Sequence, residues 1–224
     1  MGVVFTLSGP SGVGKTTFLN LINASKKQMS LEFIPRYANR PIRDGEIEGF
    51  EYFFISSNTM LDKVFNNDFI HFEKWGDYYS AIETSSIDRI INSKNNGLIL
   101  ASAFGTSRLQ ATYKDKIIPI YMWPGSYETL YAPSCLSPFS NEVLELKWRI
   151  RKKLVDDGFS EYEKASLSNN EFLDKRMIDN YLDIAAINGK FKAGENIFVL
   201  SNFHNKEIET VEIFRKMYNK TSGL

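Results

Sequence analysis

The chain has 224 residues, with 27 Lys and Arg against 27 Asp and Glu, so its formal net charge at pH 7 is zero. Hydrophobic residues make up 43% of the sequence and charged residues 24%, which is typical of a globular domain and argues against long disordered regions. Because a protein that coats DNA or an anionic membrane needs an excess of Lys and Arg, the zero balance argues against both roles.

The cysteine content and the length of the apolar runs exclude further classes of protein. Cys135 is the single cysteine, which excludes an internal disulfide framework and a zinc site built from several cysteines. No apolar run approaches the roughly 20 residues of a membrane span, and the N-terminus lacks the basic segment of a signal peptide. We therefore expect a cytoplasmic protein without a membrane partner, and we interpret Cys135 and His71 as structural. The oligomeric state is left open.

Predicted strands and helices alternate along the chain. Strands are expected at residues 3–8, 31–38, 52–56, 68–75, 78–82, 97–102, 117–122 and 197–200, with helices at 15–24, 57–65, 84–93, 141–156 and about 206–218, and one more between the strands at 97–102 and 117–122. This alternation predicts an α/β fold with a mostly parallel sheet and right-handed crossovers. Prolines interrupt the pattern between residues 123 and 175, where we expect an inserted lobe or lid.

A glycine-rich motif follows the first strand. Residues 9–16, GPSGVGKT, satisfy G-x-x-x-x-G-K-[ST] at every fixed position, with a predicted strand before and a predicted helix after. Glycines allow the backbone to wrap around a phosphate with its N–H groups pointing inward, and the positive end of the helix dipole adds to the attraction. The motif predicts an ATP site with Mg²⁺ as cofactor, in which Lys15 bridges phosphates and Thr16 binds the metal. Its predicted residues are Gly9, Pro10, Ser11, Gly12, Val13, Gly14, Lys15, Thr16 and Thr17.

Four further segments resemble guanylate kinases. Residues 36–55 resemble the segment of that family in which Arg-x-x-Arg-x-Gly-Glu leads into a Tyr-x-Phe strand. Residues 76–79 are similar to its Gly-Asn-Tyr-Tyr turn, residues 175–177 to its Lys-Arg-Met, and residues 198–202 to its last strand ending in Asn. The resemblance implies a three-layer P-loop NTPase fold. It implies a core of residues 1–34, 84–124 and 175–224, an acceptor-binding lobe of residues 35–83, and a lid of residues 125–174.

The resemblance also implies roles for individual residues. Arg40, Arg43, Tyr52 and Tyr79 match positions that bind the phosphate of the acceptor, and Arg guanidinium groups can present a planar fork to such a phosphate. Lys15 is the expected catalytic cation of the P-loop. Arg176, in the matching Lys-Arg-Met, and Arg149, on the charged helix of the lid, are the expected catalytic cations of the lid.

The chain departs from guanylate kinases where they read the guanine base. Their base-reading Glu falls near Ile70 or His71 here, their Ser/Thr near Ala81, and their Asp at Ser102. Glu73 would replace the Glu if the strand register slips, because guanine presents two N–H donors that call for a carboxylate. Arg36 stands where the family has Ser. Arg36 and Tyr37, together with Arg40, also resemble the Arg-Tyr-Ile-Thr-Arg segment of ribose 1,5-bisphosphate phosphokinases, in which Arg36 would bind a second phosphate.

We therefore expect an ATP- and Mg²⁺-dependent phosphotransferase that acts on a small acceptor already carrying phosphate, with GMP favoured by the family. A ribose 1,5-bisphosphate-type sugar kinase is the first alternative, and a weakly catalytic guanylate-kinase-like binding module is the second. The zero net charge argues against a nucleic-acid kinase, which only the basic helix of the lid favours.

Overall fold

The computed structural model describes residues 1–25, 29–43, 45–75, 78–132, 135, 137, 140–156, 170–192 and 195–222. These residues form two compact units. The first unit consists of residues 1–8 and 27–119, and the second consists of residues 9–26 and 120–224. Among the described residues, no helix is both long and apolar enough to cross a bilayer.

Among its described residues, the first unit contains seven strands, the beginning of an eighth, and helices between them. Its elements are β1 (Val4–Ser8), β2 (Leu31–Phe33), β3 (Arg36–Ala38), β4 (Tyr52–Phe54), α2 (Ser57–Phe65), β5 (Phe69–Trp75), β6 (Tyr78–Glu83), α3 (Thr84–Ile91), β7 (Asn96–Leu100), α4 (Ala103–Tyr113) and the 3-10 helix η2 (Lys114–Lys116). The second unit carries most of the long helices. Its elements are α1 (Lys15–Ser25), most of β8 (Ile117–Trp123), α5 (Tyr127–Tyr131), α6 (Asn141–Asp156), α8 (Asn170–Lys192), β9 (Phe198–Ser201) and α9 (Glu207–Ser222).

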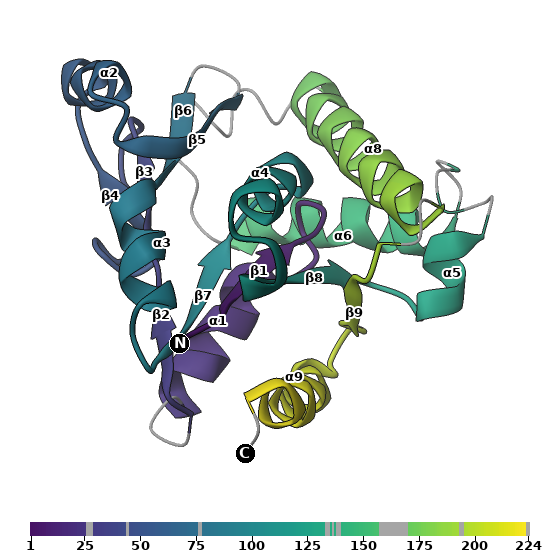
Figure 1. The fold of residues 1–224 in the computed structure, drawn as a ribbon. Coiled ribbons are helices and arrows are strands. Elements are labelled where there is room, and N and C mark those ends of the chain that lie inside the picture. Colours follow the sequence, from purple (N-terminus) through teal and green to yellow (C-terminus); the bar gives the residue numbers. More distant parts are fainter. Residues whose placement is uncertain are drawn as a thin grey trace. The chain divides into compact units, whose positions relative to one another are not determined.

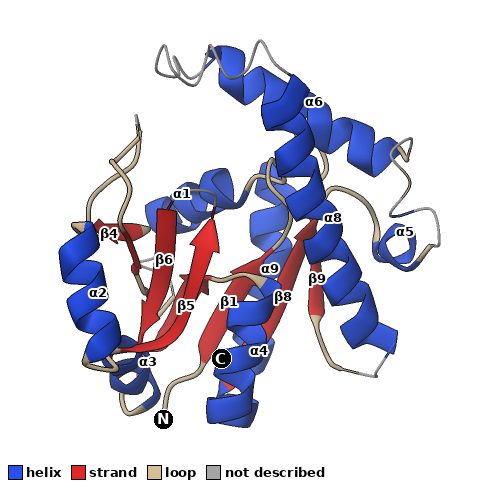
Figure 2. Cartoon of the chain, turned by 90° about the horizontal axis from the view of Figure 1, so that it is seen from above, coloured by secondary structure: helices blue, strands red, loops and turns tan. Residues whose placement is uncertain are grey.

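The strands form two sheets, which confirms the predicted α/β fold. The five-stranded sheet has the order β2-β7-β1-β8-β9, and the pairs β2–β7, β7–β1 and β8–β9 are parallel. The four-stranded sheet has the order β4-β3-β6-β5 and is mixed, with β3 parallel to β4 and antiparallel to β6. Figure 2 shows α2 alongside the four-stranded sheet.

The predicted single strand at residues 31–38 is wrong in one respect. It consists of two short strands, β2 and β3, that belong to different sheets. Pro35 separates them, because proline has no N–H for a ladder and restricts the residue before it. The chain thereby leaves the parallel sheet directly before Arg36 and enters the four-stranded sheet with it.

Each unit has its own apolar packing. In the first unit, one buried cluster packs β1 and β7 against α3 and α4 and consists of Val4, Ile34, Ile82, Ile87, Ile90, Ile99, Ala101, Leu109 and Ile117. In the second unit, α1 packs on α9, where the rings of Phe18 and Phe214 meet edge to face at 5.3 Å. The helix α8, which the sequence pattern did not predict, packs against α5 and α6 (Figure 1).

Candidate functional site

The glycine-rich loop of residues 9–16, here called the phosphate loop, lies in the second unit between the end of β1 and the first residue of α1. Gly9, Gly12 and Gly14 have φ values of +145°, +84° and +100°, a region that residues with a Cβ rarely adopt. A Cβ added at Gly14 would lie 2.6 Å from the Nδ2 atom of Asn202, and one at Gly12 would lie 2.8 Å from Ile150. The loop therefore requires glycine for its backbone and for its packing.

Two asparagines hold the phosphate loop from outside the motif. Asn202, after β9, donates to the carbonyl oxygen of Val13 at 2.6 Å and is itself bonded by the Thr210 hydroxyl at 2.9 Å. Asn180, on α8, accepts from the Ser11 N–H at 2.6 Å and donates to the Ser11 carbonyl at 3.3 Å. Both asparagine side chains are buried. The matched final strand included Asn202, but no sequence signal identified Asn180.

Lys15 and Thr16, the motif residues predicted to bind phosphate and Mg²⁺, differ in their surroundings. The ammonium of Lys15 donates to the carbonyl oxygens of Gly9 at 2.6 Å and Pro10 at 2.9 Å, so it lies against the loop itself. Thr16 and Thr17, in the first turn of α1, are exposed. The N-terminal turn of a helix offers N–H groups and a positive dipole to an anion. The loop thus combines the donors, the cation and the exposed hydroxyl that a nucleoside triphosphate with Mg²⁺ requires.

The structure describes the side chain of only one of the two predicted catalytic arginines, Arg149. Arg149, on α6, uses all three guanidinium nitrogens within the second unit: Nε donates to Glu145 at 2.8 Å, Nη1 to the Val13 carbonyl at 3.3 Å and Nη2 to the Asn202 carbonyl at 3.1 Å. Arg149 thereby connects α6 to the phosphate loop at Val13 and to Asn202. The side chain of Arg176 lies outside the described residues, although α8 includes its backbone.

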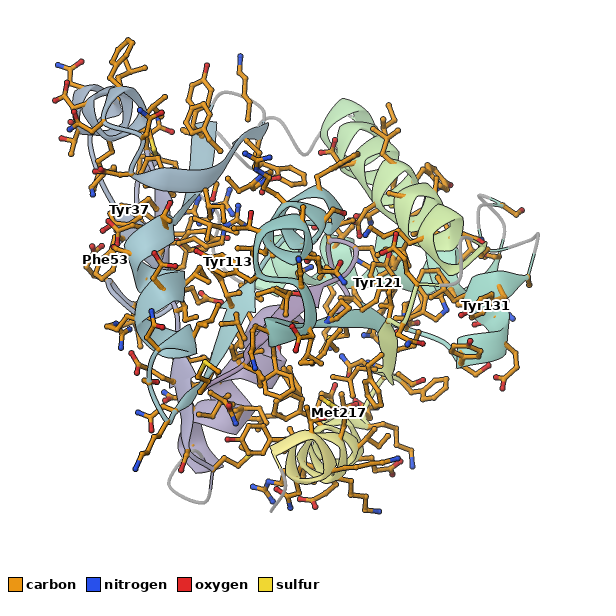
Figure 3. The ribbon with its side chains drawn as sticks, viewed as in Figure 1. Tyr37, Phe53, Tyr113, Tyr121, Tyr131 and Met217 are labelled. Carbon is orange, nitrogen blue, oxygen red and sulfur yellow. The ribbon has the colours of Figure 1, made fainter. Side chains whose placement is uncertain are left out.

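The acceptor residues predicted from the sequence all lie in the first unit, and four of them, Arg36, Tyr52, Glu73 and Tyr79, are on strands of the four-stranded sheet. Arg36 pairs with Tyr52 across β3 and β4, and Glu73 pairs with Ser80 across β5 and β6. Because side chains alternate between the faces of a sheet, this register places Arg36, Tyr52 and Glu73 on one face. The opposite face carries the adjacent aromatic rings of Tyr37 and Phe53, whose centroids lie 5.3 Å apart (Figure 3).

Tyr79 does not share the sheet face of Arg36, Tyr52 and Glu73. It pairs with Lys74 across the hairpin, and its ring stacks on that of Phe72 at 4.9 Å with an interplanar angle of 9°. The alternation places this stack on the same face as Tyr37. Tyr78, which the sequence analysis did not single out, shares the face of Glu73 and is exposed.

Arg40 is oriented by a residue of its own motif. Its Nη1 and Nη2 donate to the two carboxylate oxygens of Glu46 at 2.7 and 2.5 Å, a bidentate pair, and Nη1 also donates to the Pro41 carbonyl at 2.9 Å. The guanidinium lies 5.1 Å from the ring centres of both Tyr52 and Phe54. Among the described residues, no acceptor bonds to Nε, which forms the side edge of the guanidinium together with the second N–H of Nη2. That edge has the geometry that binds a phosphate.

The Arg40–Glu46 pair also changes both pKa values. Burial alone would lower the pKa of Arg40 and raise that of Glu46. The bidentate pair outweighs burial, so that the pKa of Arg40 is raised and that of Glu46 is lowered. Arg43 contributes its backbone N–H to Glu46 at 2.9 Å, and its side chain is exposed. The Glu of the Gly-Glu motif therefore acts as a positioning group, a role that the sequence analysis did not assign.

A second network surrounds Glu73. Its Oε1 accepts from Arg36 at 2.5 Å, and its Oε2 accepts from Ser102 at 2.7 Å and lies 3.0 Å from Nε2 of His71. Ser102 is also the N-cap of α4, where its hydroxyl accepts from the Gly105 N–H at 2.9 Å. The structure thus brings together three predicted substrate residues, Arg36, Glu73 and Ser102. It adds His71, which the sequence analysis had interpreted as structural.

The network keeps Glu73 ionised. Burial alone would raise the pKa of the Glu73 carboxyl. The hydrogen bond from His71, the positive charge of Arg36 and the hydrogen bond from Ser102 outweigh burial and lower this pKa to about 2. Because an ionised carboxylate only accepts hydrogen bonds, Nε2 of His71 carries the proton in this contact.

The position of Glu73 depends on a β-bulge. The pairing of β5 with β6 shifts by one residue between Phe69 and His71. This irregularity is a β-bulge two residues before Glu73, the residue for which the sequence analysis considered a shifted register. Because a one-residue shift reverses which side chains face a given side, the bulge places Glu73 opposite Ser80 and beside Arg36.

A family model described as guanylate kinase matches residues 2–154, which include the phosphate loop and all the acceptor residues. The chain belongs to the guanylate kinase family. It is 31% identical over 174 residues to the guanylate kinase of Mycoplasma mobile, covering 75% of this chain and 86% of that protein. It is 25% identical over 175 residues to the guanylate kinase of Porphyromonas gingivalis, covering 77% and 92%.

The fold is also that of a guanylate kinase. The crystal structure of guanylate kinase from Anaplasma phagocytophilum aligns with a TM-score of 0.60 at 14% sequence identity, and the alignment covers 99% of this chain and 86% of that one. The family match ends at residue 154. Asn180 and Asn202, which hold the phosphate loop from α8 and after β9, therefore lie beyond it.

Proposed function

We propose that the protein is an ATP-dependent nucleoside monophosphate kinase, with GMP as the acceptor that its family favours. The observation that carries this proposal is the phosphate loop, with its glycines at positive φ, the Lys15 ammonium on the loop and the exposed Thr16. Family membership supports a nucleotide substrate for the same loop.

The residues present fit ATP and Mg²⁺. A Cβ at Gly12 or Gly14 would meet Ile150 or Asn202, so the loop keeps its cradle only as glycine. The loop N–H groups and Lys15 would hold the phosphates, and the Thr16 hydroxyl would hold the metal ion. When bound, Mg²⁺ neutralises charge on the transferred phosphoryl group. Lys15 would exchange the carbonyl oxygens of Gly9 and Pro10 for phosphate oxygens.

The acceptor would be held by the first unit. Arg40, fixed by Glu46, would present its Nε and Nη2 edge to the acceptor phosphate, and the exposed Arg43 would add a second cation. Tyr52, whose ring lies under Arg40, would add a hydroxyl donor. Phosphoryl transfer requires little more of a protein than alignment and neutralisation of charge. These residues provide both for a monophosphate.

The test is ADP production with ATP and Mg²⁺ in the presence of GMP, dGMP, AMP, CMP, UMP or ribose 1,5-bisphosphate. We expect stimulation by a nucleoside monophosphate, and loss of about 100-fold or more of that turnover in Lys15→Ala. Lys216→Ala, which removes an exposed lysine of α9, is the matched control and should retain wild-type turnover. Tight ATP binding without stimulation by any acceptor would favour the binding module instead.

A further inference from the structure

The Arg36–Glu73 network includes Arg36, which stands where the sequence analysis expects Ser in guanylate kinases, and its chemistry restricts what it can bind. Arg36 is 5% exposed and its cation is paired with the ionised Glu73, so the pair carries no net charge. A second phosphate would meet the Glu73 carboxylate directly, and like charges in a buried site repel strongly. The network therefore fits a neutral group of the acceptor and not the second phosphate of a sugar bisphosphate.

The number of hydrogen bonds that Glu73 can still accept restricts that group further. An ionised carboxylate has about four acceptor positions, two on each oxygen. Ser102 and His71 occupy those of Oε2, and Arg36 occupies one of Oε1. Trp75 is a further and smaller cause of the lowered pKa of Glu73. At most one position thus remains for a ligand.

Arg36 supplies the complementary donor. Its Nε is buried, and within the described part of the chain no residue accepts a hydrogen bond from it. A buried donor without an acceptor costs about as much as a lost hydrogen bond, so a ligand oxygen placed there would remove that cost. The network therefore offers a ligand one donor, Nε of Arg36, and at most one acceptor position on Glu73.

Building on the proposed function, we propose that Arg36 and Glu73 form the base-reading pair of this kinase and recognise one oxo group and one ring N–H of a 6-oxopurine, without using the 2-amino group. Guanine carries two adjacent donors, N1–H and the 2-amino group, and Glu73 can accept only one of them. Hypoxanthine carries the same oxo group and N1–H but no 2-amino group. Arg36 thus decides specificity by occupying the position that the amino group would need.

The experiment compares the binding of IMP and GMP to the full chain by isothermal titration calorimetry. We expect the Kd of IMP to lie within about threefold of that of GMP, or to be lower, because an unpaired 2-amino group contributes no affinity. A Kd for IMP more than about tenfold above that of GMP, the cost of one lost hydrogen bond, would overturn the proposal. Tighter binding of ribose 1,5-bisphosphate than of either nucleotide would also overturn it.

Variants test whether Arg36 is the cause. Arg36→Ser frees a position on Oε1 of Glu73 and should increase the preference for GMP over IMP by at least about fivefold. Arg89→Ser is the matched control, because Arg89 forms an exposed pair with Glu32 elsewhere in the same unit, and its preference should equal that of the wild type. Ser102→Ala frees a position on Oε2 and should change the preference in the same direction as Arg36→Ser. An unchanged preference in both folded variants would refute the role of the pair.

Measuring ADP production with GMP and with IMP distinguishes a failure of the base-reading pair from a failure of the kinase proposal. If GMP and IMP bind equally but neither stimulates ADP production, the kinase proposal fails while the base-reading pair stands. If GMP is phosphorylated and IMP neither binds nor reacts, the kinase proposal stands and the base-reading pair fails.

Discussion

The Asn202 side chain donates a 2.6 Å hydrogen bond to the carbonyl oxygen of Val13, and so ties the end of β9 to the phosphate loop. Asn202→Ala leaves this carbonyl with the longer contact from Arg149 and removes one of the three acceptors near the Thr210 hydroxyl. We expect a loss of about 1–3 kcal/mol in the free energy of unfolding and weaker ATP binding. Urea unfolding and calorimetric titration measure the two effects. Asn219→Ala, at an exposed position of α9, should change neither.

The glycines of the phosphate loop give a second prediction, in which backbone strain and steric clash are separated. Gly14→Ala adds a Cβ at a φ of +100° and 2.6 Å from Asn202, whereas Gly45→Ala adds one at a φ of +79° with no heavy atom within 4 Å. Gly45→Ala should cost about 1 kcal/mol of stability and leave ATP affinity unchanged. Gly14→Ala should cost more and weaken ATP binding by at least about tenfold. Equal effects of the two substitutions on ATP affinity would contradict the assignment of the loop.

Arg149 distinguishes a positioning role from a catalytic one. Its three guanidinium nitrogens already donate to Glu145, to the carbonyl oxygen of Val13 in the phosphate loop and to that of Asn202. Arg149→Ala should therefore raise the KM for ATP by about tenfold and lower the thermal midpoint, with a smaller effect on kcat. A lower kcat with an unchanged KM for ATP would instead indicate that Arg149 contacts the transferred phosphoryl group. Lys152→Ala, on the exposed side of the same helix, serves as the control.

Glu46 should affect the acceptor and not ATP. Glu46→Gln keeps the size of the side chain but replaces one of the two charge-assisted acceptors of Arg40 with an amide. We expect the Kd for GMP to rise by about tenfold, the cost of one charge-assisted hydrogen bond, and the Kd for ATP to stay unchanged. Glu209→Gln, in an exposed pair on α9, is the control. A parallel loss of ATP affinity would mean that Glu46 serves the stability of the fold rather than the orientation of Arg40.

The lowered pKa of Glu73 predicts how stability depends on pH. Its carboxyl has a pKa of about 2 in the folded chain against an ordinary value of 4.5. The unfolded state therefore binds the proton first, so the stabilisation is complete above pH 4.5 and is lost as pH falls from 4.5 to about 2. At neutral pH it amounts to at most about 3 kcal/mol. The difference in unfolding free energy between wild type and Glu73→Gln should shrink across this interval, whereas that for Glu32→Gln, in an exposed pair, should stay small throughout.

The local sequence was sufficient to predict the phosphate loop and the fold class of this protein. The spacing of Gly9, Gly12, Gly14, Lys15 and Thr16 predicts a phosphate loop because backbone conformation and helix start depend on neighbouring residues. The alternation of apolar strands and amphipathic helices predicted the α/β fold for the same reason. Prolines and turn residues placed most element ends within a few residues, and the break at Pro35 was missed although the residue itself signals it.

Other features depend on residues far apart in the chain, and only the tertiary structure decided them. The β-bulge near His71 determines which face Glu73 occupies, because register is a property of two strands and not of one. Arg36 forms a hydrogen bond with Glu73, which lies 37 residues away in the sequence. Asn180 forms one with Ser11, which lies 169 residues away. The zero net charge of the sequence proved uninformative about the sites for the same reason: folding pairs Arg36 with Glu73 and Arg40 with Glu46 in the first unit, while Lys15 lies on the phosphate loop of the second.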